Sequence, residues 1–214
     1  MHSASGEGYQ SPAPALEAEI SPPGVRLPLQ PRSRASFERM IMAAHDLIEE
    51  SGLEGATVQN ILQRSGVGSG SFYARFDGRD ALLTYLALRF WSGAEEGWAG
   101  VLSPSRWAAA GPKEIVTQFT RMAVVWMHAH GALLRAFLVH AMTHAEDDLL
   151  DQTAELDNTI ADHLIRLLSL RADEFTHNHP EDAVRLATLQ VLATLRSRFI
   201  FAWGDRPDGI DDQH

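Results

Sequence analysis

The sequence predicts an all-α fold in which a small three-helix unit precedes a larger helical bundle. Apolar residues recur every three or four positions over most of the chain, as they do on the buried face of a helix. Glycine, proline and capping residues divide this pattern into helix-sized lengths. No stretch alternates apolar and polar residues as a half-buried strand would. We expect four parts, which are residues 1–31, 32–79, 80–203 and 204–214.

The composition fits a cytoplasmic protein. The 214 residues include no cysteine, which excludes disulfides, thiol nucleophiles and cysteine-based zinc sites. The N-terminus lacks the basic start and apolar run of a secretory signal. The most membrane-like stretch, Met122 to Met142, contains three histidines and an arginine and is interrupted by Gly131. We therefore expect two soluble helices there and no contact with a membrane.

The first 31 residues are rich in Ser, Gly, Ala and Pro. Such a segment buries too little apolar surface to offset the entropy lost on ordering, so we expect a disordered arm. A first helix follows, and Gly52 ends it. Its inward-facing residues are Phe37, Met40, Ile41, Ala44, Leu47 and Ile48.

A short second helix is predicted after Thr57. Val58, Ile61 and Leu62 share one face of this helix, and Thr57 can cap its N-terminus. Gly66 then supplies a break at which φ can be positive.

A third short helix is predicted after this glycine. Ser69 or Ser71 can assist its N-terminus, and Phe72 and Phe76 fall four apart on one face. Two short helices that meet at a glycine turn form a helix-turn-helix.

At these residues the sequence resembles the TetR family of bacterial transcriptional regulators, over about residues 34–90. Three positions depart from the family pattern: Gly68 replaces a Ser or Thr cap, Leu62 replaces a small Ala, and Arg79 replaces Lys. Gly can still cap a helix, and Arg keeps the positive charge. The matching residues are Thr57, Ile61, Gly66, Val67, Gly70, Ser71, Phe72, Tyr73, Phe76, Arg79, Asp80 and Leu82.

The resemblance implies a DNA-binding domain over residues 32–79 that binds a double-stranded operator. It gives phosphate contacts to Thr57, Tyr73 and Arg79, whose donors suit phosphate oxygens. In a helix-turn-helix the N-terminal residues of the recognition helix enter the major groove, which places Ser69, Gly70 and Ser71 near base edges or phosphates. The predicted DNA-binding residues are Arg34, Thr57, Gln59, Ser69, Gly70, Ser71, Tyr73, Arg75 and Arg79.

Several of these residues also have a purely structural interpretation. Thr57 can act only as a cap, Tyr73 can pack, and Arg75 can be a solvated charge. Arg34 lies where the arm meets the first helix, and in the family an arm in this place can reach DNA; it can equally be a solvated linker charge.

The net charge of −10 is distributed unevenly along the chain. Residues 32–90 contain seven Arg and seven acidic residues, whereas residues 91–214 contain ten basic and eighteen acidic residues. Because charges more than about 10 Å apart are screened at physiological salt, the acidic bundle does not prevent phosphate attraction at the helix-turn-helix. We expect modest affinity for DNA with a steep dependence on salt.

The next predicted helix starts at Asp80 and ends near Gly97, Gly100 and Ser103. Its stripe is long enough to pack on the DNA-binding unit at one end and on the larger core at the other, which makes it the expected mechanical link. The stripe consists of Leu83, Leu86, Ala87, Phe90, Trp91, Ala94 and Trp98.

Four further helices are predicted in the larger domain. They run from Pro112 to Gly131, from Ala132 to about Thr143, from the acidic residues 146–148 to Leu170, and from Pro180 to about Ala202. The last one has apolar residues on several sides, so one side can face a second subunit. Residues 204–214 read as a polar tail.

The family resemblance implies that this domain dimerises and encloses a small-molecule cavity whose ligand moves the linking helix. Aromatic and Met-rich walls with a few polar groups match a site for a small apolar effector, although an ordinary packed core has the same composition. The predicted ligand-binding residues are Trp91, Phe119, Met122, Trp126, Phe137 and His140.

The leading hypothesis is a homodimeric repressor that binds a palindromic operator and is released by the effector. One alternative is a ligand-sequestering or protein-interaction bundle with a decayed DNA-binding head. Another is a metal-dependent hydrolase that uses His140, His144 and Asp147 or Asp148. Nothing in the sequence brings a third ligand to the His140–His144 pair or to the His128–His130 pair, and no HExxH motif is present. We therefore expect no enzyme, no metal and no cofactor.

Overall fold

The computed structural model describes residues 21–143, 149–171 and 177–200, and these residues form helices and no strand. This confirms the all-α prediction. The elements are α1 (Pro31–Gly55), α2 (Val58–Ser65), α3 (Ser69–Tyr73), α4 (Arg79–Val101), the short 3-10 turn η1 (Pro104–Trp107), α5 (Pro112–Thr143), α6 (Leu149–Ser169) and α7 (Pro180–Ile200).

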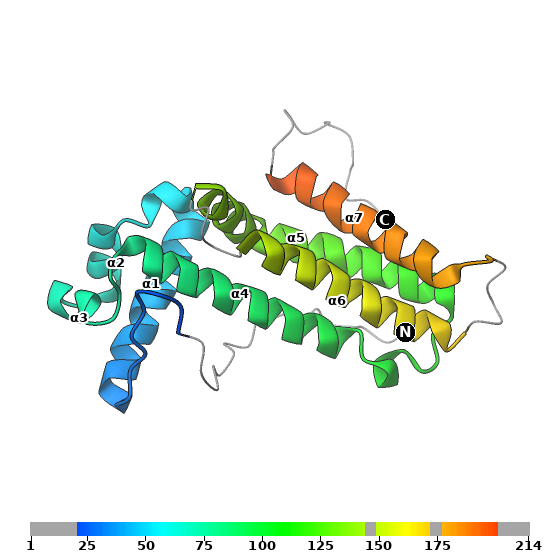
Figure 1. Ribbon diagram of the computed structural model, residues 1–214, viewed down its shortest axis with the longest axis horizontal. Helices are drawn as coiled ribbons and strands as arrows, with labels where there is room; N and C mark the ends of the chain where they lie inside the picture. Colours follow the sequence, from blue (N-terminus) through cyan, green and yellow to red (C-terminus); the bar gives the residue numbers. More distant parts are fainter. Residues whose placement is uncertain (1–20, 144–148, 172–176, 201–214) are drawn as a thin grey trace, which may run out of the picture.

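Helices α1–α3 gather at one end of an elongated molecule, and α4–α7 extend away from them as long rods (Figure 1). Helix α6 packs against both α4 and α7, and α5 contacts α1, α4, α6 and α7. Helix α5 is long and apolar enough to cross a membrane by length and composition. Its contacts with four neighbours make it the central helix of the bundle.

The helix-turn-helix forms as its capping residues predict. The Thr57 hydroxyl accepts a hydrogen bond of 3.2 Å from the backbone N–H of Asn60, and Gly66 ends α2 in the left-handed region with φ of 64°. Gly68 is the N-cap of α3 and provides no side-chain hydrogen bond. The prediction that Ser69 or Ser71 assists this N-terminus is therefore wrong.

One helix boundary differs from the prediction. Helix α5 runs unbroken through Gly131, because contacts on both sides of that residue outweigh the ~1 kcal/mol that a helical glycine costs. Gly52 interrupts α1 as predicted, since its φ of 69° and ψ of −174° are not helical, and a short helical segment follows this kink to Gly55. Pro180 begins α7 as predicted.

Part of the segment that is expected to be disordered is ordered. Residues 21–30 pack on the helix-turn-helix as an extended segment, here called the strap. Val25 forms a β-bridge with Phe76 and is buried, and Arg26 N–H and Asp77 N–H donate hydrogen bonds of 2.8 Å to the carbonyls of Arg75 and Gly24. The expectation of disorder is wrong here because composition alone does not reveal this pairing. Residues 1–20 and 204–214 lie outside the described residues.

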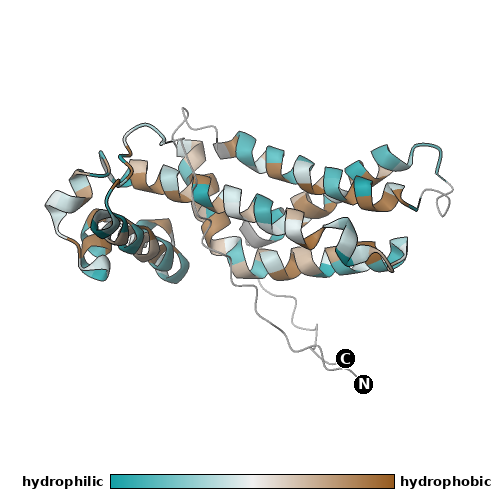
Figure 2. Cartoon of the chain, turned by 90° about the horizontal axis from the view of Figure 1, so that it is seen from below, coloured by the Kyte–Doolittle hydropathy of each residue, from teal (hydrophilic) through white to brown (hydrophobic). Residues whose placement is uncertain are grey.

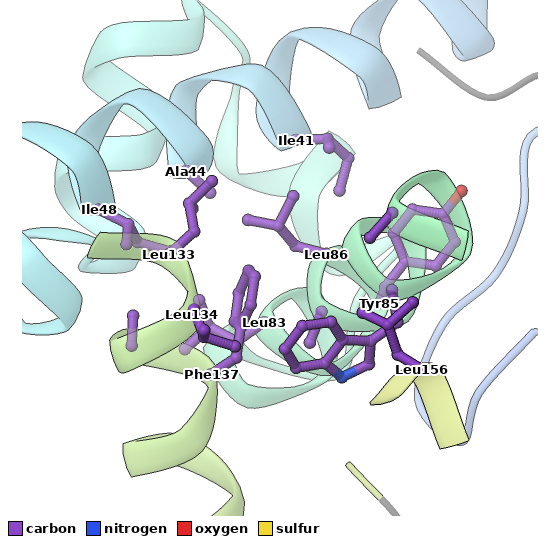
Figure 3. Close-up of a cluster of buried hydrophobic side chains, with 14 of the residues drawn as sticks. Ile41, Ala44, Ile48, Leu83, Tyr85, Leu86, Leu133, Leu134, Phe137 and Leu156 are labelled. Atoms are coloured by element: carbon purple, nitrogen blue, oxygen red, sulfur yellow. The ribbon is translucent and has the colours of Figure 1, made fainter. Parts of the chain in front are cut away.

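One hydrophobic core connects the two predicted domains. Ala44 and Ile48 of α1 lie beside Leu133 of α5, and Leu83 and Leu86 of α4 complete the contact (Figure 3). Hydrophobic residues gather on the sides of the helices that face one another (Figure 2). The N-terminal unit of α1–α3, here called the head, therefore contacts the bundle through the packing of α1 on α5 as well as through α4.

Candidate functional site

The outer face of α3 is the first candidate site. Helix α3 has only five residues, and two buried phenylalanines position it. The ring of Phe76 stacks on Phe37 of α1 with centroids 5.1 Å apart, and Phe72 lies 5.4 Å from Phe76. These contacts bury one side of α3 and turn its other side to solvent.

The predicted recognition residues lie on that solvent-facing side. Ser69, Gly70, Ser71 and Tyr73 are all exposed, with 56% of Tyr73 accessible. A Cβ atom added to Gly70 would meet no atom within 4 Å, so the fold itself does not require glycine there. The face thus combines three hydroxyl donors with a position, Gly70, that has no side chain, which suits contacts with base edges and phosphates.

Thr57 and Gln59 are exposed at the start of α2. The hydroxyl of Thr57 accepts the cap hydrogen bond, which leaves its own proton available for a phosphate oxygen. The capping and phosphate-binding interpretations of Thr57 are therefore compatible.

Arg79 and Arg75 are held by backbone carbonyls. Arg79 Nε donates a hydrogen bond of 2.8 Å to the carbonyl of Ala56, and its Nη2 donates to that of Leu53. Arg75 Nη1 lies 3.5 Å from the carbonyls of Arg26 and Leu27 in the strap. These contacts give both arginines a structural role, and the phosphate contacts remain predictions.

The other arginines near the helix-turn-helix differ in whether another group of the chain already binds their guanidinium. Arg39 donates to the carbonyl of Ser65, Arg64 pairs with Glu50, and Arg89 pairs with Glu38. Arg32 and Arg34 are exposed in the first turn of α1, and no ion pair or side-chain hydrogen bond to the described residues holds either guanidinium. They are the arginines of the described head whose charge is most available to a phosphate.

The second candidate site is a small cavity within the bundle, here called the inner cavity. Its volume is about 20 Å³, enough for one water molecule. Helices α4, α5, α6 and α7 all contribute to its wall. The lining residues are Trp91, Trp98, Ala123, Trp126, Met127, Leu134, Thr153, Leu156, Asp157, Ile160, Leu192 and Arg196.

Three buried donors around the inner cavity have no acceptor. Trp91 Nε1, Trp98 Nε1 and Arg196 Nε are the buried side-chain nitrogen or oxygen atoms without a partner in the described part of the chain. All three residues line the inner cavity. An unsatisfied buried polar group costs about 1–3 kcal/mol, so such a concentration in one place calls for an explanation.

A buried ion pair forms the polar wall of the inner cavity. Arg196 of α7 donates hydrogen bonds of 2.6 Å to both carboxylate oxygens of Asp157 in α6. Burial raises the pKa of Asp157, and the hydrogen bonds from Arg196 oppose that rise. The pair leaves the cavity with both a positive and a negative group on one wall.

The structure brings only some of the predicted ligand residues together. Trp91 and Trp126 line the inner cavity. Phe119 and Phe137 are buried behind it, with ring centroids 5.8 Å from Trp98 and 6.3 Å from Trp91, and Met122 is partly buried against the core. Phe119, Met122 and Phe137 are therefore not among the residues that line the inner cavity, and their ligand-binding role stays a prediction.

His140 is also placed away from the inner cavity. It is buried, and its Nε2 lies within hydrogen-bonding distance, 3.3 Å, of Thr84 Oγ1. His144, Asp147 and Asp148 of the hydrolase hypothesis lie outside the described residues. The described ranges contain no group of three or more His, Asp or Glu residues that could hold a metal ion.

Trp98, Asp157 and Arg196 were not predicted as site residues. In the sequence, Trp98 belongs to the apolar stripe of the linking helix, and its indole N–H carries no separate signal. Asp157 and Arg196 are 39 positions apart, and only the packing of α6 on α7 brings them together.

A larger polar cleft lies on the other side of Trp91 and Leu156, which line both spaces. This acidic cleft has a volume of about 340 Å³ and runs between α4 and α6. Its remaining lining residues are Glu95, Gln152, Glu155, Asn158, Thr159 and Asp162.

Comparison with known proteins supports the interpretation of the N-terminal unit. Residues 41–86 match the family described as bacterial regulatory proteins, tetR family. The chain is also 30% identical over 56 residues to the uncharacterized HTH-type transcriptional regulator YvdT of Bacillus subtilis (strain 168). That match covers 26% of this chain and 29% of YvdT, so it spans less than a third of the relative.

Among solved structures, the chain is similar to GusR of Salmonella enterica. The similarity covers 81% of this chain and 88% of that one, with a TM-score of 0.49 and 17% sequence identity.

Proposed function

We propose that this chain, which belongs to the TetR family through its helix-turn-helix unit, is a ligand-responsive transcriptional repressor that binds a palindromic operator as a cytoplasmic homodimer. The exposed face of α3, supported by α1 and α2 within the family match, is the observation that carries the proposal. Helix-turn-helix proteins read the major groove with the N-terminal part of this helix.

The DNA contacts divide into two groups by chemistry. Ser69, Gly70 and Ser71 would approach base edges, and Tyr73 would donate to a phosphate; the exposure of all four residues supports these roles. Arg34 supplies charge that no acidic residue of the described chain neutralises. Because its contribution is electrostatic, it should govern salt dependence more than sequence preference.

Helix α4 connects the DNA-binding face with the inner cavity. It starts at Arg79 against the turn between α1 and α2, pairs with Glu38 of α1 through Arg89, and reaches the cavity at Trp91. A ligand that opens the cavity therefore acts on the helix that positions the head. Ligand must favour the state that does not bind DNA, and a coupling of about 1–3 kcal/mol would be ordinary.

Apolar surface on α6 and α7 supports dimerisation through these helices. Leu186 is 69% exposed on α7 and Leu170 is 68% exposed directly after α6, while Leu192 of α7 is buried in the chain's own core. A second copy would cover this surface, and twofold symmetry would space two recognition helices for two half-sites.

The test is fluorescence anisotropy of the purified protein on DNA from upstream of its own gene, against random DNA, over a salt series. We expect saturable binding that prefers the upstream DNA and falls steeply with salt. Tyr73→Phe should weaken binding without changing the salt slope, and Arg34→Ala should reduce the slope by about 1. Arg106→Ala, an exposed arginine in η1, is the matched control.

Equal and weak binding of both DNAs by all variants would contradict the proposal. It would favour the alternative of a ligand-sequestering bundle with a decayed head. Sedimentation of the wild type and of Leu186→Glu tests the dimer separately, since the variant should be monomeric if α7 forms the interface.

A further inference from the structure

The unpaired hydrogen-bond donors and the ion pair around the inner cavity limit the chemical class of ligand that it can bind. We propose that it takes an uncharged, largely apolar ligand that presents acceptor oxygens, of the ketone, lactone or ether type, to Trp91, Trp98 and Arg196. This inference rests on the proposed function, because it names the chemical class of the effector.

The unpaired groups around the cavity are all donors. Each of Trp91 Nε1, Trp98 Nε1 and Arg196 Nε carries one N–H and can accept nothing. Indole and guanidinium nitrogens that are buried in native proteins normally have an acceptor. A ligand for this cavity must therefore bring acceptors, and it gains nothing from additional donors at these three positions.

The charge around the cavity favours an uncharged ligand. Asp157 already balances Arg196 inside the cavity, so an ionised carboxylate on the ligand would add an uncompensated negative charge close to Asp157. Glu95 and Glu155 in the acidic cleft would oppose an anion on its way in. A cation, in turn, would meet Arg196 and two indole N–H groups.

Apart from Thr153, the remaining wall is apolar and aromatic, which suits a flat hydrophobic body. A cavity of about 20 Å³ holds a water molecule but no larger molecule. The acidic cleft adjoins it across Trp91 and Leu156. A ligand that enters from the acidic cleft must therefore displace Trp91 of α4 or Leu156 of α6, which links this route to the position of α4.

The experiment compares three rigid probes of similar shape by isothermal titration calorimetry with the full chain. 9-Fluorenone is flat, uncharged and carries one carbonyl oxygen, fluorene lacks that oxygen, and fluorene-9-carboxylate is an anion. We expect fluorenone to bind roughly three- to tenfold more tightly than fluorene, as one additional hydrogen bond predicts, and the carboxylate to bind most weakly.

Two variants remove single donors and keep an aromatic ring. Trp91→Phe or Trp98→Phe should reduce the preference for fluorenone over fluorene toward equality. Trp107→Phe is the matched control, because its indole already donates a 2.8 Å hydrogen bond to the carbonyl of Val101 and lies outside the cavity. The control should keep the full preference.

A measurement on the unaltered protein covers the case in which a variant does not fold. In an NMR spectrum of protein labelled with nitrogen-15 on tryptophan, fluorenone should move an indole N–H proton signal of Trp91 or Trp98 downfield, and fluorene should not. The Trp107 signal should stay in place with both probes.

Three outcomes would overturn the inference: equal affinity for fluorenone and fluorene, tightest binding of the carboxylate, or no binding of any probe. In the first and third cases the donors would be satisfied by water alone. Operator binding measured on the same samples separates this inference from the proposed function. Specific DNA binding without binding of any probe would refute the proposed ligand class and leave the DNA-binding function standing. Probe binding without any effect on DNA binding would refute ligand-controlled repression and leave the ligand class standing.

Discussion

Arg79, the first residue of α4, donates a hydrogen bond of 2.8 Å from its Nε to the carbonyl oxygen of Ala56, the C-cap residue of α1. Its Nη2 reaches the neighbouring carbonyl of Leu53. One guanidinium thus fixes the start of the linking helix against the turn that leads into the helix-turn-helix. Arginine is suited to this role because its planar fork can serve two carbonyls at once.

Replacing Arg79 by Lys should lower stability while keeping the charge. Lysine cannot reproduce both hydrogen bonds, so we expect a loss of about 1–2 kcal/mol in the free energy of unfolding, measured with urea. Arg106→Lys, at an exposed position, should change nothing measurable. A stable Arg79→Lys protein with much weaker DNA binding would show that the phosphate contact, and not the carbonyl contact, is the main role.

Truncating Val25 in the strap should destabilise the DNA-binding unit. Val25 is 7% exposed and bridges Phe76, so Val25→Ala removes two buried methyl groups at a cost of about 1–2 kcal/mol. Operator affinity should also fall, because the strap pairs with the residues that directly follow α3. Leu29→Ala is the control, since Leu29 is 93% exposed in the same segment. Identical melting temperatures for the two variants would refute the structural role of the strap.

Adding a methyl group at Gly70 should separate folding from DNA binding. An added Cβ meets no atom of the chain within 4 Å, and alanine favours a helix over glycine by up to about 1 kcal/mol. Gly70→Ala should therefore be as stable as the wild type or more stable, yet bind the operator less tightly because the methyl group holds the backbone away from DNA. Gly100→Ala, which also has open space in α4, should leave DNA affinity unchanged. Equal operator affinity for both variants would place Gly70 outside the interface.

Stability should fall as the solution becomes acidic, in part because of His130. Burial of its ring, and secondarily the charge of His45, lower the pKa of His130 below the usual value of about 6.5. Between the lowered pKa and 6.5 the unfolded chain binds more protons than the folded chain, so stability is present above pH 6.5 and is lost as the pH falls through this window.

Urea unfolding at several pH values tests this dependence. His130→Gln should reduce the loss of stability below pH 6.5, whereas His179→Gln, at an exposed position, should not. An unchanged pH profile in His130→Gln would mean that the ring gains a proton in the folded state as easily as in the unfolded state.

Interactions between residues that are close in the sequence determine much of this protein's secondary structure. The apolar periodicity predicted the α-helices apart from the break expected at Gly131, Thr57 and Gly66 specified the bounds of α2, and Pro180 specified the start of α7. These features depend on residues within one or two turns of each other, which is why they can be read from sequence. The family pattern around α3 is local for the same reason.

Tertiary structure decided the rest, because it depends on which distant side chains meet. The pairing of the strap with Phe76, the unbroken course of α5 through Gly131 and the continuous core between head and bundle are all products of packing. The inner cavity is the clearest case: helices α4, α6 and α7 must come together before Trp98, Asp157 and Arg196 surround one space. Sequence determined that the donors exist, and only the fold buried them without acceptors.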